Sequence, residues 1–90
     1  MERIYVDRSV VDEFLDAFAR RTQALRMSAQ IGWGADVGSL ISQRQRDRVA
    51  GHVENAVKLG ADVIVGGKPR PDIGPYFFAP TILTGVREDM

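Results

Sequence analysis

The chain has 90 residues, of which 44% are hydrophobic and 27% charged, and its 12 basic and 12 acidic side chains give a formal net charge of zero. This length allows one small domain. The charge balance argues against a nucleic-acid-binding protein, which usually carries a basic excess. With no cysteine and one histidine, the sequence offers no disulfide framework and no metal-ligand spacing. No apolar run is long enough to cross a membrane, and we expect a cytoplasmic protein.

The first predicted elements are a strand and a helix. Residues 3–6, Arg-Ile-Tyr-Val, are β-prone and indicate a strand that begins where the chain begins. This suggests that the natural polypeptide extends further upstream. Ser9 is predicted to cap the helix, with Asp12 as the capping-box acid. The helix is expected to turn one apolar stripe inward, made of Val11, Phe14, Leu15, Phe18, Ala19, Thr22 and Leu25.

Residues 26–37 lose this periodicity and predict a loop that contains the single tryptophan, Trp33. We favour the interpretation in which Trp33 anchors the loop against the fold. The alternative places Trp33 at an interface, where tryptophan is enriched.

A second helix is predicted from Ser42 to Leu59. Ser42 and Gln45 form a capping-box pair, and Gly60 ends the helix because glycine enters the left-handed conformation at little cost. Arg44, Arg46 and Arg48 occupy alternate positions of this helix. They therefore point in diverging directions and are expected on a solvated surface. The predicted inner face consists of Ile41, Gln45, Val49, Val53, Ala56 and Val57.

Two β-prone runs follow. Residues 62–65 read as a buried strand closed by Gly66 and Gly67, and residues 76–83 read as a second strand interrupted by Pro80. The connection is short for a crossover, so these strands are expected to be antiparallel neighbours. The strand at residues 3–6 would lie parallel to one of them. The predicted fold is α/β, with two helices packed on a small mixed sheet.

Several short motifs stand in a fixed order along the chain: Glu2-Arg3-Ile4-Tyr5-Val6, Asp12-Glu13-Phe14, Gly38-Ser39-Leu40-Ile41-Ser42, Gly60-Ala61, Gly66-Gly67 and Tyr76-Phe77-x-x-Pro80-Thr81. Taken together, these motifs resemble the NAD(P)-dependent aldehyde dehydrogenase superfamily. The resemblance implies that residues 1–90 form a single incomplete domain, part of the catalytic domain just after the nucleophilic cysteine. It also implies that the Glu-x-Phe-Gly-Pro motif follows shortly after the chain.

The reaction implied by this resemblance begins with a thiolate that attacks an aldehyde and forms a thiohemiacetal. Hydride then passes to NAD or NADP, and a glutamate-activated water releases the carboxylic acid. Overall likeness suggests succinate semialdehyde as the substrate. The chain holds no catalytic residue of this kind and no dinucleotide fingerprint. We therefore expect the isolated chain to be inactive and to bind no cofactor.

Two residues match positions next to the cofactor in the family. Gln45 corresponds to a glutamine near the nicotinamide-side ribose, and Arg48 to a position where many members have lysine. The resemblance implies that both contact NAD or NADP in the parent enzyme, near a helix N-terminus that favours anionic phosphates. The alternative is that Gln45 only caps the helix and Arg48 is solvated. Gly38-Ser39, where the family often has Gly-Pro, departs from the pattern.

A different class of function is a stand-alone protein-interaction module derived from the same domain, without catalysis. In either case the sheet would lack neighbouring strands, and its exposed edges predict self-association. The apolar side chains expected to be uncovered are Ile4, Val6, Phe77, Phe78, Ile82 and Leu83.

Overall fold

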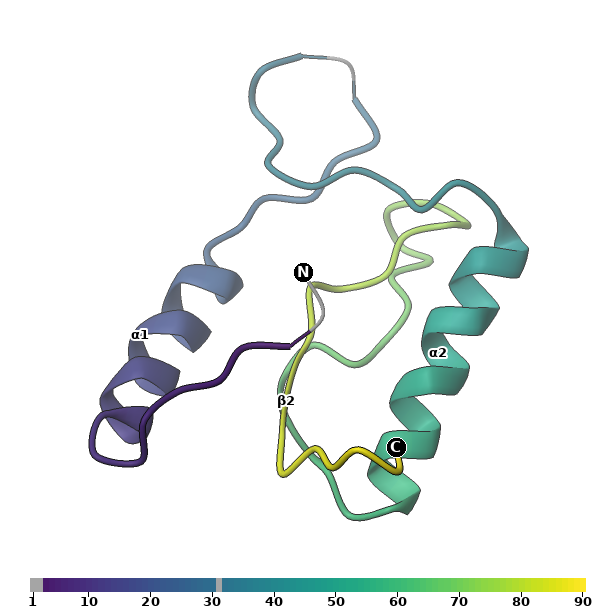
Figure 1. The fold of residues 1–90 in the computed structure, drawn as a ribbon. Helices are drawn as coiled ribbons and strands as arrows, with labels where there is room; N and C mark the ends of the chain where they lie inside the picture. The colour runs from purple at the N-terminus through teal and green to yellow at the C-terminus, as the bar shows by residue number, and fades with distance from the viewer. Residues whose placement is uncertain (1–2, 31) are drawn as a thin grey trace.

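The computed structural model describes residues 3–30 and 32–90. This part of the chain contains helix α1 (Val11–Gln23), helix α2 (Gln43–Lys58), strand β1 (Asp62–Val65) and strand β2 (Ile82–Thr84). The two helices flank the strands, with α1 on one side and α2 on the other (Figure 1). The predicted α/β arrangement of two helices and a small sheet is confirmed.

The sheet is antiparallel, which confirms the predicted pairing of these two runs. Asp62 lies opposite Thr84, Val63 opposite Leu83 and Val65 opposite Ile82, with an irregularity in register between Val63 and Val65. The second strand is shorter than predicted and starts only after Pro80. A proline has no N–H to donate to a ladder, so regular pairing begins beyond it.

The predicted mixed sheet is wrong for the described residues. Residues 3–7 belong to no strand, so the parallel pairing expected of residues 3–6 does not form. An extended segment becomes a strand only when a neighbour accepts and donates its backbone hydrogen bonds. The only sheet in the described part of the chain has the order β1-β2.

The start of α1 differs from the prediction. Its N-cap residue is Val10, with no side-chain capping bond, and Ser9 is occupied elsewhere. The Ser9 N–H and hydroxyl both donate to Asp7 Oδ1, at 2.9 and 2.7 Å. These bonds lower the pKa of Asp7 and form a local turn that competes with the cap. Acidic residues in the first turn and basic residues in the last turn still complement the helix dipole.

Helix α2 starts and ends where the sequence predicts. Ser42 is the N-cap, and its hydroxyl accepts from the Gln45 N–H at 3.2 Å. Gly60 follows the C-cap residue Leu59 with a φ of 110°, in the region that favours glycine. Ile41, predicted on the inner face, is 90% exposed because it precedes the N-cap and lies outside the helix.

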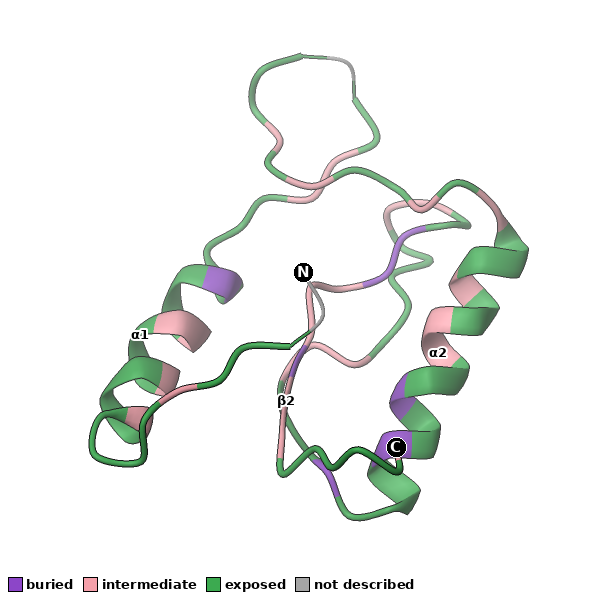
Figure 2. Ribbon diagram, in the orientation of Figure 1, coloured by how far each residue is buried: buried purple, intermediate pink, exposed green. Residues whose placement is uncertain are grey.

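The core lies where α2 meets the strands and the turn that precedes β2, and most of the remaining surface is exposed (Figure 2). The side chains of Phe77, Phe78 and Ile82 are buried there, so the prediction that they are uncovered is wrong. The strand at residues 62–65, predicted to be buried, is mostly exposed. The buried apolar residues are Val53, Ala56, Ala61, Phe77, Phe78 and Ile82.

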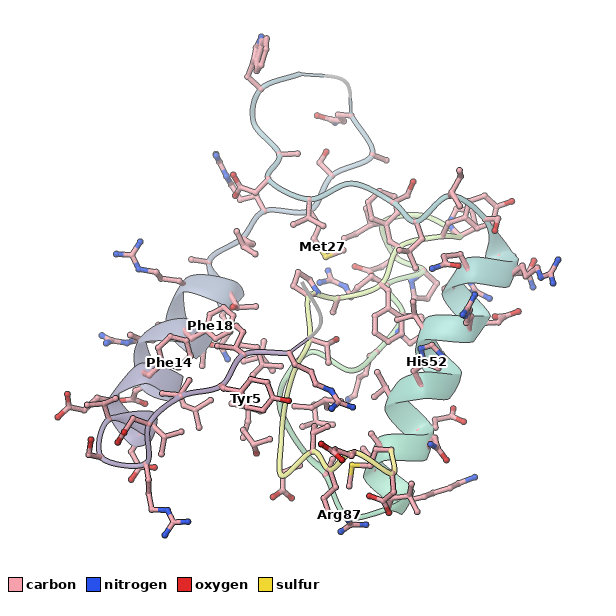
Figure 3. All side chains as sticks on the ribbon, in the orientation of Figure 1. Tyr5, Phe14, Phe18, Met27, His52 and Arg87 are labelled. Carbon is pink, nitrogen blue, oxygen red and sulfur yellow. The ribbon has the colours of Figure 1, made fainter. Side chains whose placement is uncertain are left out.

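Helix α1 is less deeply packed. Its predicted inner stripe is half-buried over most of its length, and only Thr22 of that stripe is buried. Phe14 and Phe18 lie together on the helix, with ring centroids 5.3 Å apart (Figure 3). Because Phe14 remains 36% exposed, this pair does not close a core by itself.

The loop between the helices projects away from them (Figure 1). Its neck is closed by Arg26 and Asp36: the Asp36 carboxylate accepts from the Arg26 N–H at 2.9 Å, and the Asp36 N–H donates to the Arg26 carbonyl at 2.8 Å. Trp33 is 102% exposed, so the prediction that it anchors the loop is wrong.

Candidate functional site

Gln45 and Arg48 both lie in the first half of α2 and are exposed. The described part of the chain shows no bond from the Gln45 amide back to the Ser42 N–H, so only half of the predicted capping box forms. The Gln45 amide and the Arg48 guanidinium therefore remain accessible to a ligand. His52, one turn after Arg48, is exposed on the same helix (Figure 3).

The first turn of α2 suits an anion. Residues 43–46 are two glutamines and two arginines, without an acidic residue. The backbone N–H groups at a helix N-terminus carry a partial positive charge, which favours phosphate groups nearby. Amide and guanidinium groups can bind ribose hydroxyls and phosphate oxygens. The chemistry of this surface suits an anionic ligand, whereas no group of three metal-ligating side chains is found among the described residues.

The start of α2 is held by the turn that precedes Phe77. The Leu40 N–H donates to the Tyr76 carbonyl at 2.9 Å, and Arg46 Nη1 donates to the neighbouring Pro75 carbonyl at 2.6 Å. Arg46 was predicted to be a solvated arginine, and this prediction is wrong. Its place one helical turn after the Ser42 cap was a possible signal.

A second contact joins the two glycines after β1 to the Pro-Thr pair before β2. Gly66 has a φ of 73°, and a Cβ there would lie 2.2 Å from the Pro80 carbonyl oxygen. The Gly67 N–H donates to Thr81 Oγ1 at 2.9 Å. Only glycine fits at position 66, because the backbone conformation and the close approach both exclude a side chain.

A cleft of about 460 Å³ separates α1 from this glycine turn. Arg70 contributes to its lining, but the guanidinium is engaged by Asp72 through bonds of 3.0 and 2.8 Å. These bonds lower the pKa of Asp72. Of the other lining residues, only Thr22 and Gln23 are polar, and none is titratable. The lining residues of the cleft are Thr22, Gln23, Leu25, Met27, Val65, Gly66, Arg70, Ile73, Ala79 and Pro80.

The sequence model of the "Aldehyde dehydrogenase family" matches residues 1–90. The chain belongs to the aldehyde dehydrogenase family. This confirms the resemblance drawn from the ordered motifs. Among curated relatives, the chain is 51% identical over 90 residues to a Mycolicibacterium smegmatis protein named "Putative succinate-semialdehyde dehydrogenase (NADP+)". It is 44% identical over 90 residues to a Mycobacterium tuberculosis protein of similar name. Both matches cover 100% of the chain and 17% of the relative.

Solved structures agree with the fold. An aldehyde dehydrogenase from Brucella melitensis superposes with a TM-score of 0.88 at 40% identity, over 98% of this chain and 18% of that one. A succinate-semialdehyde dehydrogenase from Burkholderia pseudomallei gives a TM-score of 0.86 at 36% identity, over 92% of this chain and 17% of that one. A Staphylococcus aureus betaine aldehyde dehydrogenase in complex with NAD+ gives a TM-score of 0.86 at 28% identity, over 94% of this chain and 18% of that one. The chain thus spans less than a fifth of the length of these proteins.

Among the described residues, no helix is long and apolar enough to cross a membrane.

Proposed function

We propose that the chain is a segment of the catalytic domain of an NAD(P)-dependent aldehyde dehydrogenase, which oxidises an aldehyde to a carboxylic acid. The observation that carries this proposal is the family match over the whole chain, together with the similar folds of the solved dehydrogenases. Succinate semialdehyde is the substrate we propose, because the relatives at 44–51% identity carry that name. The cytoplasm is the proposed compartment.

Within this enzyme, we assign Gln45 and Arg48 to the binding of NAD or NADP. The cofactor accepts the hydride that leaves the substrate carbon. The chain's own contribution is to present an amide, a guanidinium and a helix N-terminus, whose first turn has no acidic residue, to the ribose and phosphates. No residue of this chain is assigned to nucleophilic attack or to general-base catalysis, because no cysteine is present and no glutamate matches the family's base.

We further propose that residues 1–90 are an incomplete domain. The accessible surface is 7131 Å² for a mass of 10.0 kDa, whereas a monomeric protein of this mass exposes about 5,200 Å². The radius of gyration is 14.1 Å, against about 12 Å for a compact domain of this length. The excess surface of about 1,900 Å² exceeds the roughly 800 Å² that each partner contributes to a standard interface.

The same surface supports the alternative function, a stand-alone interaction module, and it supports self-association of the isolated chain. The exposed apolar side chains include Val63 and Ile64 on β1, Ile4 near the N-terminus and Val57 on α2. A module of this kind would bind a partner through this surface and would never need a cofactor.

A segment exchange separates the two functions. The matched residues of the M. smegmatis relative are replaced by this chain, and the resulting chimera is compared with the unaltered relative. We expect the chimera to fold and to reduce NADP+ or NAD+ with succinate semialdehyde. A folded chimera that shows no activity, beside an active host, would contradict the dehydrogenase assignment and favour the interaction module.

The cofactor assignment needs a variant within the chimera. Gln45→Ala is expected to raise the cofactor KM about tenfold, the change that corresponds to one lost interaction of about 1.4 kcal/mol. If Gln45 has no part in cofactor binding, the variant leaves the cofactor KM unchanged. The melting temperature should also stay the same, because the capping bond to Ser42 uses the Gln45 backbone N–H, which alanine keeps.

A further inference from the structure

Arg46 differs from the other arginines of α2 because its side chain is directed into the protein. The side chain is only 23% exposed, and Nη1 donates to the Pro75 carbonyl at 2.6 Å. Nη2 reaches the neighbouring Asp47 carboxylate at 3.3 Å. The bond to Pro75 is the stronger attachment of this side chain, because it is much shorter and because the Asp47 carboxylate is 62% exposed and screened by water.

The bond from Arg46 acts together with a second one on the other side of the helix cap. Leu40 lies before the Ser42 N-cap and donates its N–H to the Tyr76 carbonyl at 2.9 Å. Arg46 lies after the cap and donates to the preceding carbonyl, that of Pro75. Two successive carbonyls of one turn therefore hold the chain on both sides of the point where α2 begins.

The turn that supplies these carbonyls is itself fixed. The Arg70 N–H donates to the Phe77 carbonyl at 2.8 Å, and the Phe77 ring is buried in the core. A Cβ at Gly74 would lie 2.8 Å from the Phe77 ring, so the turn closes directly over that side chain. The two bonds thus tie the first turn of α2 to the core and not to a mobile loop.

We infer that Arg46 is a positioning residue for the dinucleotide-facing surface formed by Gln45 and Arg48. This inference rests on the proposed function of that surface. Gln45 directly precedes Arg46, and Arg48 follows two residues later, so any fraying or rotation of the first turn displaces both side chains. Binding depends on placing donors to within a fraction of an ångström, and a fixed first turn provides that placement.

The test compares three single variants in the chimera. Arg46→Met removes both donors but keeps the apolar stem, Arg46→Lys keeps a charge and a donor, and Asp47→Asn is the matched control that leaves the bond to Pro75 intact. We expect Arg46→Met to raise the cofactor KM and the dissociation constant of NADP+ about tenfold, with kcat within twofold. Arg46→Lys should show an intermediate increase, and Asp47→Asn should remain within twofold of the chimera.

A measurement on the 90-residue chain itself gives a readout that does not depend on activity. Arg46→Met should accelerate hydrogen exchange of the Leu40 amide, because loss of one bond loosens the whole start of α2. If Arg46→Met does not fold, Arg46→Lys carries the same comparison.

The outcomes distinguish the inference from the proposed function. An increase in the cofactor constants for both Gln45→Ala and the Arg46 variants supports the inference. An increase for Gln45→Ala alone overturns it and leaves the cofactor surface standing. If neither variant changes cofactor binding in an active chimera, the assignment of Gln45 and Arg48 to cofactor binding is wrong. Arg46 then has no binding surface to position. Loss of stability in Arg46→Met with unchanged cofactor constants also overturns the inference and reduces Arg46 to a structural residue.

Discussion

Thr81 receives a hydrogen bond from the Gly67 N–H at 2.9 Å and passes one to the Ala79 carbonyl at 2.7 Å. One hydroxyl thereby joins the end of β1 to the approach to β2. The two short motifs that contributed to the family resemblance, Gly66-Gly67 and Pro80-Thr81, are therefore a single structural unit. Their residue types follow from this contact, since position 66 has no room for a side chain and position 81 needs both a donor and an acceptor.

The first prediction concerns this unit. Thr81→Val keeps the side-chain shape but leaves the part-buried Gly67 N–H without its acceptor, which should lower the free energy of unfolding by about 1–3 kcal/mol. Gly66→Ala should cost at least as much, because alanine is strained at a φ of 73° and its Cβ would meet the Pro80 carbonyl. Urea denaturation at a fixed protein concentration measures both.

The matched control for these variants is Gly51→Ala. Gly51 lies within α2, and a Cβ there would meet nothing within 4 Å. Alanine should stabilise the helix by about 1 kcal/mol through its higher helix propensity. Equal losses of stability in Gly51→Ala and Gly66→Ala would show that the close contact with Pro80 has no special role.

The second prediction is that the 90-residue chain alone has no dehydrogenase activity. It contains no cysteine to form a covalent intermediate, and esterase activity that needs an activated thiol is excluded for the same reason. Reduction of NAD+ or NADP+ is followed at 340 nm with succinate semialdehyde, using heat-treated protein as the control. Activity that co-elutes with the chain in gel filtration would refute this expectation.

Features that depend on neighbouring residues could be predicted from the sequence, whereas features that depend on residues far away along the chain could not. Ser42 and Gly60 were correctly identified as the ends of α2, because capping depends on residues within one turn. The strand expected at residues 3–6 failed because a strand needs a partner from elsewhere in the chain, which local sequence does not reveal. The prediction that Ser9 caps α1 was wrong because a closer acceptor, Asp7, competes for the Ser9 hydroxyl.

The same distinction between short-range and long-range contacts applies to the candidate site. The positions of Gln45 and Arg48 came from the resemblance. Helix periodicity placed Gln45 on the inner face, and this prediction is wrong because Gln45 is exposed. Arg46 was missed because its partner, the Pro75 carbonyl, lies 29 residues away in the sequence. The burial of Phe77 and Phe78 was missed for a related reason: the turn at residues 74–77 folds against the start of α2, a contact that hydrophobic patterning does not specify.

The third prediction concerns acid sensitivity at the loop neck. The hydrogen bond from the Arg26 N–H, aided by the charge of Arg26, lowers the pKa of Asp36 below its usual 3.8. A carboxyl group whose pKa is lower in the folded state contributes stability above the unfolded pKa and loses it as the pH falls through the folded value. The neck should therefore be closed above about pH 4, and it should open as the pH falls through the lower pKa that Asp36 has in the folded state.

The Asp36 carboxyl carbon shift in an NMR titration measures this directly, and its midpoint should lie below 3.8. Trp33, the single tryptophan, reports on the loop through its fluorescence anisotropy. Asp36→Asn keeps an oxygen acceptor for the Arg26 N–H but removes the charge, so the acid-dependent change in anisotropy should disappear. A titration midpoint at or above 3.8 would contradict the closed neck.

The last prediction is that the isolated chain associates with itself. Its accessible surface exceeds that of a compact monomer by about 1,900 Å², and among the described residues no side chain is buried to below 2% exposure. Val63 and Ile64 on β1 are each 42% exposed, next to an edge whose backbone groups can pair with a second chain. Pairing would extend the sheet and cover these side chains in one step.

Analytical ultracentrifugation from micromolar to millimolar concentration measures the association, and we expect the mean mass to rise above 10.0 kDa. Ile64→Lys, which places a charge on the exposed strand, should shift the equilibrium toward monomer. Arg44→Gln is the matched control, because Arg44 is exposed and lies in the first turn of α2, at the opposite end of that helix from β1. A folded chain that stays monomeric at millimolar concentration would show that the exposed surface does not drive association of this segment, and the interaction-module alternative would lose its main support.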